Sequence, residues 1–364
     1  MWVYGLLLLV VFIILAVFFI SLIRFSYKSI KRLTNKKALS VIITILITFI
    51  VFALIFIDVT NVIVLYIHLF VIISLTKLVC YFINRKREKK ISSNVSLCIG
   101  IFLTAIYMVV GFINFYKVEK TEYDVITAKN LVNDLTIVQI ADSHLGYTMS
   151  GKRFNKYLEE VNKLNPDIVV ITGDFIDDGT PYEDMIEGAN GLGNLNTKYG
   201  VYFVYGNHDK GYYNSRGYGN AELREALKKN NVTILEDDFV ELDNNIVLVG
   251  RQDAIVGNRK SIQDIVKDID KNKYIIVLNH QPTDYDNEEE AKVDLVLSGH
   301  THGGQLIPLG TLGVVLGPND KTYGMEKRGD TTFIVTSGIS DWAMVFKTGA
   351  ISEYNFIRIT NGND

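Results

Sequence analysis

Every histidine downstream of residue 134 stands at the end of a short apolar stretch of sequence. These five histidines are His144, His208, His280, His300 and His302. His300 and His302 stand two residues apart, as do Asp142 and His144, and an extended backbone sends both side chains of such a pair to the same side. The spacing predicts that imidazole and carboxylate groups converge where several strands end.

Asp174 and Asn207 follow two further apolar stretches and add oxygen donors to this set. Two Asp, one Asn and four His suit two borderline divalent ions, such as Mn, Fe, Co or Zn, better than Ca or Mg, which prefer all-oxygen ligands. Both cysteines, Cys80 and Cys98, lie elsewhere in the chain, so a Cys-ligated zinc site is excluded here. A pair of divalent ions about 3.5–4 Å apart generates hydroxide at neutral pH and holds the attacking and leaving oxygens of a phosphoryl displacement.

Each piece of this pattern has an ordinary alternative on its own. An Asp-Ser-His tripeptide is a common turn or helix cap, Gly-Asp and Gly-Asn pairs are typical of turns, and a lone His280 is more often a satisfied core residue. Because the pieces occur together and in order, each after an apolar stretch, the pattern favours a metal centre over a series of coincidences.

Alternating strands and helices are predicted to position these side chains. Short apolar runs predict strands at 135–141, 167–172, 201–205, 232–235, 239–242, 246–249, 274–278, 295–297, 332–335 and 352–359. Helical periodicity predicts helices at 153–164, 182–195 and 261–269. Polar clusters that follow successive strands are typical of an α/β enzyme with its site at the carboxyl edge of a sheet.

The ordered motifs resemble those of the calcineurin-like metallophosphoesterases. The matching blocks are Asp142-x-His144, Gly173-Asp174-x-x-Asp177, Gly206-Asn207-His208-Asp209, His280 and Gly299-His300-Thr301-His302. All five blocks are intact, and the resemblance covers about residues 135–359. It implies an α/β fold in which two mixed β-sheets form a sandwich flanked by helices.

The resemblance also implies a dinuclear site that holds two divalent ions, with Mn, Fe or Zn as the expected metals. One ion would be held by Asp142, His144 and His302. The other would be held by Asn207, His280 and His300. Asp174 would bridge the two ions together with the attacking hydroxide, since a carboxylate between two cations offsets their repulsion and fixes their spacing.

Three further roles come from the same resemblance. His208 would stabilise or protonate the departing oxygen, with Asp209 orienting it, and Asp177 would support the ligands through hydrogen bonds. The continuation Gly303-Gly304-Gln305 resembles a subfamily of membrane-associated bacterial members that includes hydrolases of lipid-linked UDP-sugars.

The net charge of −3 averages two different segments of the chain. Residues 1–116 carry twelve Lys or Arg against two acids, a net charge of +10, and the rest carries 25 bases against 38 acids, a net charge of −13. The acidic segment offers no basic track for a phosphate backbone, so nucleic acid is not an expected partner. The predicted organisation is a membrane region at 1–116, a linker at 117–134 and one catalytic domain at 135–364.

Four apolar runs predict four transmembrane helices, since each is close to the ~20 residues that a helix needs to cross a bilayer. They cover 2–23, 39–57, 62–83 and 95–115. The loops after the first and third runs carry six and five bases, which predicts that both loops are cytoplasmic. An even number of crossings then places the catalytic domain on the extracytoplasmic face of the cell membrane. His68 and Lys77 lie inside the third run. His68 is interpreted as a neutral side chain near the outer headgroups, and Lys77 as a side chain whose ammonium group reaches the cytoplasmic headgroups.

The sequence therefore predicts a membrane-anchored hydrolase of a phosphate ester or pyrophosphate. A lipid-linked or nucleotide-sugar substrate is favoured because four spans would hold the site near the bilayer. A phosphatase or phosphodiesterase for a soluble substrate stays open, as does a metal-binding sensor or assembly protein without turnover. Substrate contacts are expected from the loop at 211–219 or from the apolar cluster at 342–346, although an exposed loop and a buried core segment are the ordinary alternatives. Where family members often place an arginine, this chain has Lys347.

Overall fold

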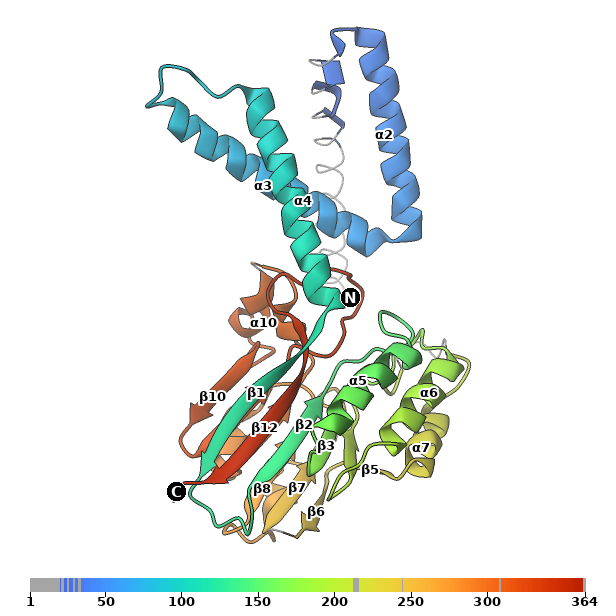
Figure 1. The fold of residues 1–364 in the computed structure, drawn as a ribbon, viewed down its shortest axis with the longest axis vertical. Helices are drawn as coiled ribbons and strands as arrows, with labels where there is room; N and C mark the ends of the chain where they lie inside the picture. Colours follow the sequence, from blue (N-terminus) through green and yellow to red (C-terminus); the bar gives the residue numbers. More distant parts are fainter. Residues whose placement is uncertain are drawn as a thin grey trace. The chain divides into compact units, whose positions relative to one another are not determined.

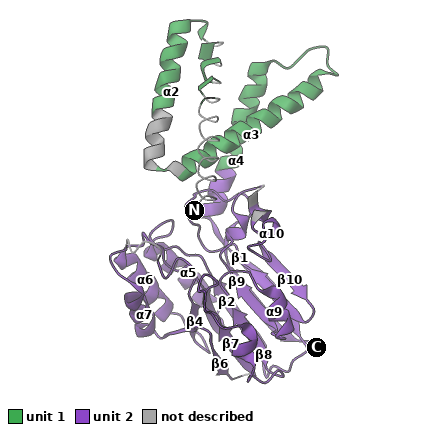
Figure 2. Ribbon diagram, turned by 180° about the vertical axis from the view of Figure 1, so that it is seen from behind, with its two compact units in different colours: residues 1–108 green, residues 109–364 purple. Residues whose placement is uncertain are grey.

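The computed structural model describes residues 20, 23–24, 26–28, 30–31, 34–211, 216–243, 245–307 and 309–362. The chain divides into two compact units, residues 1–108 and 109–364, each of which is described by itself (Figure 2). Most of the first predicted span, at 2–23, and the two adjacent tyrosines of the 211–219 loop, Tyr212 and Tyr213, lie outside the described residues.

Apolar helices make up the first unit. They are α2 (Lys37–Ile57), α3 (Val59–Asn84) and α4 (Ser93–Tyr116), whose last residues belong to the second unit. α3 begins at Asp58, which caps it by accepting a hydrogen bond from the Asn61 amide (3.0 Å). His68 lies inside α3, where one ring nitrogen is 2.7 Å from the Val64 carbonyl oxygen, so its polar atom is satisfied within the helix.

The structure supports two of the four predicted spans. Thr60–Asn84 and Ser93–Tyr116 are helical, and both are long and apolar enough to cross a membrane. The prediction of four spans is not supported, because within the described residues only these two helices meet the length and hydropathy of a span, and most of the first run lies outside them.

The second unit is built on two six-stranded mixed sheets that pack face to face (Figure 1). The strands of the first sheet are β1 (Val118–Thr127), β2 (Leu135–Ile140), β3 (Ile168–Thr172), β4 (Val201–Val204), β5 (Val232–Ile234) and β12 (Ser352–Asn361). The strands of the second are β6 (Asp238–Leu242), β7 (Ile246–Gly250), β8 (Tyr274–Leu278), β9 (Leu295–Ser298), β10 (Gly324–Arg328) and β11 (Thr331–Val335). Their spatial orders are β1-β12-β2-β3-β4-β5 and β10-β11-β9-β8-β7-β6.

Helices cover the outer faces of both sheets. On the first sheet these are α5 (Gly151–Lys163), α6 (Tyr182–Gly193) and α7 (Asn220–Lys229), which share a buried apolar cluster with β2, β3 and β4. On the second they are α8 (Ile262–Val266) and α9 (Tyr285–Glu290). The short helix α10 (Leu312–Val315) follows β9 and two single 3₁₀ turns.

β2 shows why the central strands are apolar throughout. Leu135 and Ile137 belong to the cluster between the two sheets, whereas Val138 and Ile140 belong to the cluster under the helices. Alternate side chains of a strand point to opposite faces, so a strand covered on both faces is apolar at nearly every position. The α/β sandwich of two mixed sheets flanked by helices, expected from the resemblance, is confirmed.

The predicted linker at 117–134 is wrong for its first half, because residues 118–127 form β1, which pairs in parallel with β12. Its charges suggested a solvated segment. They are satisfied across the ladder instead, since Arg358 on β12 lies 2.8 Å from Glu122 and 2.7 Å from Asp124. Cross-strand pairs of opposite charge stabilise an edge strand that apolar periodicity does not reveal.

The parallel strands bring the predicted site residues to one end of the sandwich. β2, β3 and β4 run parallel in the first sheet, and β7, β8, β9 and β11 run parallel in the second. The segments that follow β2, β3, β4, β8 and β9 carry all seven predicted metal ligands. Carboxyl ends of parallel strands share one edge of their sheet, which is where α/β enzymes place their sites.

Candidate metal centre

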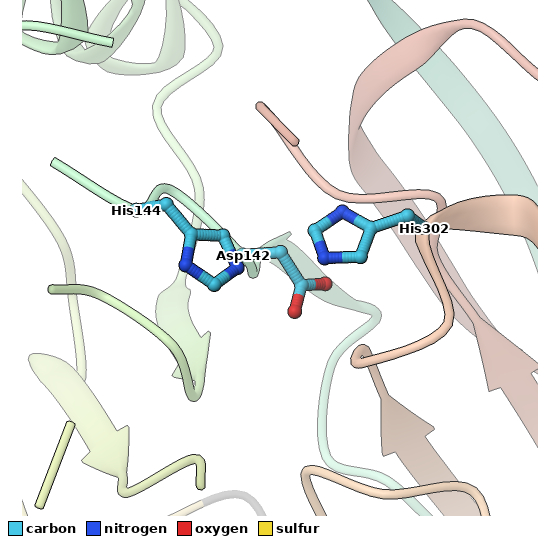
Figure 3. Close-up of side chains that lie close together, drawn as sticks. All are labelled: Asp142, His144 and His302. Atoms are coloured by element: carbon cyan, nitrogen blue, oxygen red, sulfur yellow. The ribbon is translucent and has the colours of Figure 1, made fainter. Parts of the chain in front are cut away.

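The first group of donors joins the two sheets. Asp142 and His144 follow β2, whereas His302 follows β9. One ligand atom from each of the three side chains lies within 4.8 Å of the others (Figure 3). All three side chains are buried, and the rings of His144 and His302 stack with centroids 5.2 Å apart. Figure 3 shows both rings and the carboxylate of Asp142 turned toward one common point.

The second group lies beside it. Asp174 follows β3, His280 follows β8 and His300 follows β9, and their ligand atoms also lie within 4.8 Å of one another. Asn207, after β4, completes the group, because its Oδ1 lies 3.1 Å from Nε2 of His280. The structure therefore brings together all seven side chains that the sequence predicted as ligands.

Asp174 lies between the two groups. Its Oδ2 is 3.2 Å from Nε2 of His280 and 3.8 Å from Nε2 of His144, while its Oδ1 accepts a hydrogen bond from the His208 amide (2.8 Å). This is the position that a carboxylate shared by two cations requires.

Hydrogen bonds fix the ring orientations of three of the histidines. Nδ1 of His144 lies 3.2 Å from Oδ2 of Asp177, Nδ1 of His280 lies 2.8 Å from the carbonyl oxygen of Thr172, and Nδ1 of His302 lies 3.3 Å from the carbonyl oxygen of Ser340. Because each Nδ1 faces an acceptor, it can hold the ring proton, so that the neutral ring presents the lone pair of Nε2 to a metal ion.

These lone pairs are directed toward oxygens or toward no partner at all. Nε2 of His144 is buried without a hydrogen-bond partner among the described residues, and Nε2 of His280 faces the oxygens of Asp174 and Asn207. A buried acceptor without a donor is costly, and acceptors that face one another repel unless a cation lies between them. The donor set therefore fits divalent metal ions.

The backbone of the site is strained in a way that points to function. Five of the seven residues have positive φ: Asp142 (55°), His144 (39°), Asp174 (51°), His300 (72°) and His302 (50°). Such values are uncommon outside glycine and persist only where the surrounding structure enforces them, as it does at functional sites. The two packed sheets supply that enforcement.

Two glycines allow the strand ends to approach closely. Gly173 has φ +88°, and a Cβ there would lie 2.4 Å from Nδ1 of His280. At Gly206 a Cβ would lie 2.2 Å from Oδ1 of Asp174. Neither position has room for a side chain, which explains both glycines of these motifs in physical terms.

Comparison with known proteins gives the same assignment. Residues 135–304 match the family model described as calcineurin-like phosphoesterase. An uncharacterized metallophosphoesterase of Helicobacter pylori is 32% identical over 73% of this chain and 71% of its own length. The chain belongs to the calcineurin-like phosphoesterases.

Two other similarities are less extensive. A Danio rerio protein named "Transmembrane protein with metallophosphoesterase domain" is 30% identical over 74% of this chain and 64% of its own length. Among solved structures, Haemophilus influenzae NAD nucleotidase covers 57% of this chain at 17% identity with a TM-score of 0.36.

In this calcineurin-like phosphoesterase Asp177, not Asp209, holds the ring of His208. Oδ1 of Asp177 lies 3.1 Å from Nδ1 of His208, and its Oδ2 holds His144. Burial lowers the pKa of the His208 imidazole, but the hydrogen bond with Asp177 and the charges of Asp174 and Asp177 raise it by more, so the net shift is upward. Asp177 thus links a predicted ligand to the predicted proton donor.

Asp209 has a different position from the one expected. Its carboxylate accepts hydrogen bonds from the backbone amides of Asp174, Phe175, Ile176 and Gly206, at 2.7 to 3.0 Å. It therefore ties the loop after β3 to the loop after β4. The expectation that Asp209 orients the His208 ring is corrected, because its carboxylate bonds to these amides while Nδ1 of His208 faces Asp177.

Three further residues lie around the site: Trp342, from the cluster where substrate contacts were expected, and Asp341 and Lys347, to which the sequence assigned no role. Trp342 is half exposed, and its ring lies 5.2 Å from that of His208. Asp341 is fully buried beside His302. Lys347, placed where relatives often have a substrate-contacting arginine, is fully buried instead, with its Nζ 3.3 Å from Asp341 and 2.6 Å from the Ser337 carbonyl oxygen. In the sequence, Asp341 and Lys347 are the two charged residues that flank the apolar cluster at 342–346.

Proposed function

We propose that this protein is a dinuclear-metal hydrolase of a phosphate ester or phosphoric anhydride that acts at a membrane. The observation that carries the proposal is the arrangement at His280, whose Nε2 lone pair faces the oxygens of Asp174 and Asn207 at 3.2 and 3.1 Å. A divalent cation among these three atoms would accept the His280 lone pair and offset the charge of Asp174, whereas without a metal the ring must be protonated to face these oxygens favourably.

The two groups of donors divide the ions between them. Asp142, His144 and His302 would hold one ion, and Asn207, His280 and His300 the other, with Asp174 shared by both. Divalent ions in such a site lower the pKa of water and offset the negative charge that builds up on a phosphoryl group. Burial and the neighbouring His280 lower the pKa of His300 to about 3, so this ring is neutral and available as a ligand at physiological pH.

His208 would donate the proton to the leaving oxygen. Its raised pKa keeps the imidazole protonated at neutral pH more fully than a free histidine, and Asp177 fixes the direction of its ring. Trp342 packs beside this ring and gives the substrate a flat apolar surface next to the proton donor.

Hydrolysis of a generic aryl phosphodiester by the purified full-length protein with Mn²⁺ tests this assignment. We expect turnover that His208→Ala reduces by about 10²- to 10⁴-fold, the range for loss of a general acid, while Mn²⁺ content is retained. Metal binding without turnover on any phosphate ester or anhydride would contradict the enzyme assignment and favour a metal-binding sensor or assembly protein.

A substrate that resides in the membrane is the favoured class, such as a lipid-linked phosphate or a lipid-linked nucleotide-sugar pyrophosphate. α4 meets the length and hydropathy of a membrane span and continues directly into the catalytic unit. The resemblance of Gly303-Gly304-Gln305 to the subfamily that includes lipid-linked UDP-sugar hydrolases supports the same class. A screen of lipid pyrophosphates and nucleotide sugars against soluble phosphomonoesters and phosphodiesters tests it.

We place the catalytic unit on the extracytoplasmic face. Five bases at 85–90 precede α4, and short basic loops stay in the cytoplasm, so a single crossing by α4 leads to the outer face. Protease added to intact cells should then remove the domain. Protection of the domain, together with a carboxyl-terminal reporter that is active only in the cytoplasm, would reverse the orientation.

A further inference from the structure

The loop at residues 303–319 exposes apolar side chains and carries no charge. It contains no Asp, Glu, Lys or Arg, in a chain of which 21% is charged. Val315 and Leu316 are 74% and 75% exposed, and Ile307 and Val314 are 55% and 40% exposed. Single exposed apolar residues are ordinary, but four of them within one uncharged loop form a patch that marks an interaction site.

This loop is joined to the end of α4 by way of residues 347 and 348. The Thr348 amide donates to the Gln305 carbonyl oxygen (2.7 Å), and the Thr348 hydroxyl accepts from the Ile307 amide (3.0 Å). The Lys347 amide donates to the Gly111 carbonyl oxygen (2.9 Å), and a Cβ at Gly111 would lie 2.8 Å from the Thr348 methyl group. In Figures 1 and 2, α10 lies at the same end of the second unit as these last residues of α4.

The end of α4 has the features of a helix leaving a bilayer. Its last two turns expose Val109, Val110, Phe112 and Ile113. The helix ends at Tyr116, and the guanidinium of Arg153 lies 4.0 Å from the centre of the Tyr116 ring. Aromatic rings and basic side chains at the end of an apolar helix are typical of the headgroup level.

We propose that the apolar side chains of Ile307, Val315 and Leu316 insert into the headgroup region of the bilayer beside α4. The inference rests on the proposed membrane association of α4. The partner is the lipid surface, because the patch lacks charge, exposes four aliphatic side chains and lies beside the end of a membrane-length helix.

A pocket connects this loop with the metal centre. It has a volume of ≈ 250 Å³ and is lined by His300, Thr301, Gly304, Leu306, Gly310 and Met344, among others. With the loop in the headgroup region, the wall of the pocket lies at the lipid surface. A phosphoester or pyrophosphate headgroup can then reach the metal donors while its apolar chain stays in the bilayer.

Spin labels in the full-length protein test the position of the loop. The protein is reconstituted in nanodiscs with Cys80 and Cys98 replaced by serine, and single cysteines are introduced by Leu316→Cys, Ile113→Cys or Val132→Cys. Val132 is the matched control, since it is 76% exposed and lies in the turn between β1 and β2. Accessibility of each nitroxide to O₂ and to a water-soluble nickel chelate gives its depth.

The label at 316 should favour O₂ over the nickel chelate, as should the label at 113, whereas the label at 132 should favour the chelate. A label at 316 that is as accessible to the chelate as the one at 132 overturns the inference. The inference is also overturned if neither reagent reaches the label at 316 and its spectrum shows dipolar broadening. That result would mean that a second copy of the chain covers the patch. A label at 113 that is accessible to the nickel chelate would instead refute the membrane association of α4. None of these accessibility measurements depends on catalytic activity.

Activity supplies a second, independent test. Val315→Asp with Leu316→Asp should reduce hydrolysis of a polyprenyl pyrophosphate in nanodiscs by about tenfold or more, given the apolar area withdrawn from lipid. Hydrolysis of a soluble aryl phosphodiester by the same variant should stay within about twofold of wild type, since surface substitutions away from a site are nearly neutral. Equal losses on both substrates would contradict a role in membrane contact.

Discussion

The carboxylate of Asp341 lies 3.1 Å from Nδ1 of His302, and both side chains are buried at the metal centre. On its other side the same carboxylate oxygen lies 3.3 Å from Nζ of Lys347. The backbone of Lys347 is in turn bonded to Gly111 at the end of α4. A short chain of contacts therefore connects the carboxyl-terminal end of a membrane-length helix with the ring of a predicted ligand.

Removing the cation from this buried pair should affect both stability and metal affinity. Lys347→Met leaves the Asp341 carboxylate without its counter-ion, which costs about 3–5 kcal/mol of unfolding free energy. Because Asp341 also orients His302, Mn²⁺ affinity should fall by about 10- to 100-fold. Thermal unfolding in detergent and Mn²⁺ titration measure the two effects. The matched control is Lys321→Met, which removes a partly exposed lysine 3.0 Å from Glu326 and should cost at most about 1 kcal/mol.

A methyl group at Gly173 should disrupt the metal centre. Gly173→Ala places a Cβ 2.4 Å from Nδ1 of His280 at φ +88°, so both the backbone and the ring must shift. We expect a loss of about 1–3 kcal/mol of stability and of most activity. Gly179→Ala is the control in the same loop, because no atom lies within 4 Å of its Cβ position. If both variants behave alike, the close approach at Gly173 is not what the site requires.

Sequence alone predicted that these side chains converge, because chemistry and strand order constrain them together. Each lies a few residues after an apolar strand, and parallel strands bring such positions to one edge, so Asp142 and His300 could be related although they are 158 positions apart in sequence. The partners of those ligands were harder to predict. Asp177 and Asp209 are both acids near His208, and only the backbone path shows that Asp177 reaches the ring while Asp209 bonds to amides.

The errors in the fold have a common physical cause. β1 carries charges that are satisfied by β12, more than 200 residues later, and no local pattern records such a pairing. The role of Lys347 stayed open for a similar reason, because its ammonium group reaches inward to the buried Asp341 and no apolar periodicity records that contact.

The pH dependence of turnover should report the link between Asp177 and His208. The pKa of His208 is raised above its usual value by Asp177, and a general acid acts only while protonated, so activity is lost as pH rises through that pKa. Asp177→Asn removes the carboxylate, lowers the pKa of His208 and should move the alkaline limb of the kcat/KM profile to lower pH. The profile is measured at saturating Mn²⁺, because Asp177 also holds His144. An alkaline limb at the wild-type position would mean that His208 is not the titrating acid.

Metal binding should stabilise the fold through Asp174. The nitrogen and oxygen donors of both groups converge around Asp174, so divalent ions that bind the folded site and not the unfolded chain stabilise the fold. Mn²⁺ at 100 times its Kd should add about 2.7 kcal/mol to the unfolding free energy, seen as a higher Tm that a chelator reverses. Asp174→Asn should abolish most of this shift. Asp167→Asn is the control and should retain the shift. Asp167 directly precedes β3, and its carboxylate accepts a hydrogen bond from the Thr136 amide on β2. Equal loss of the shift in both variants would place the metal elsewhere.

Trp342 should contribute to substrate binding and not to the chemical step. Its ring lies 5.2 Å from that of His208 and is 46% exposed, so one side supports the proton donor while the rest is open to a ligand. Trp342→Ala should raise KM by about tenfold, in keeping with the 1–3 kcal/mol typical of a stacked ring, and leave kcat nearly unchanged. The control is Tyr182→Ala, an aromatic residue of similar exposure on α6 that packs on Tyr218, and its KM should match wild type. A fall in kcat with constant KM would show instead that Trp342 acts by positioning His208.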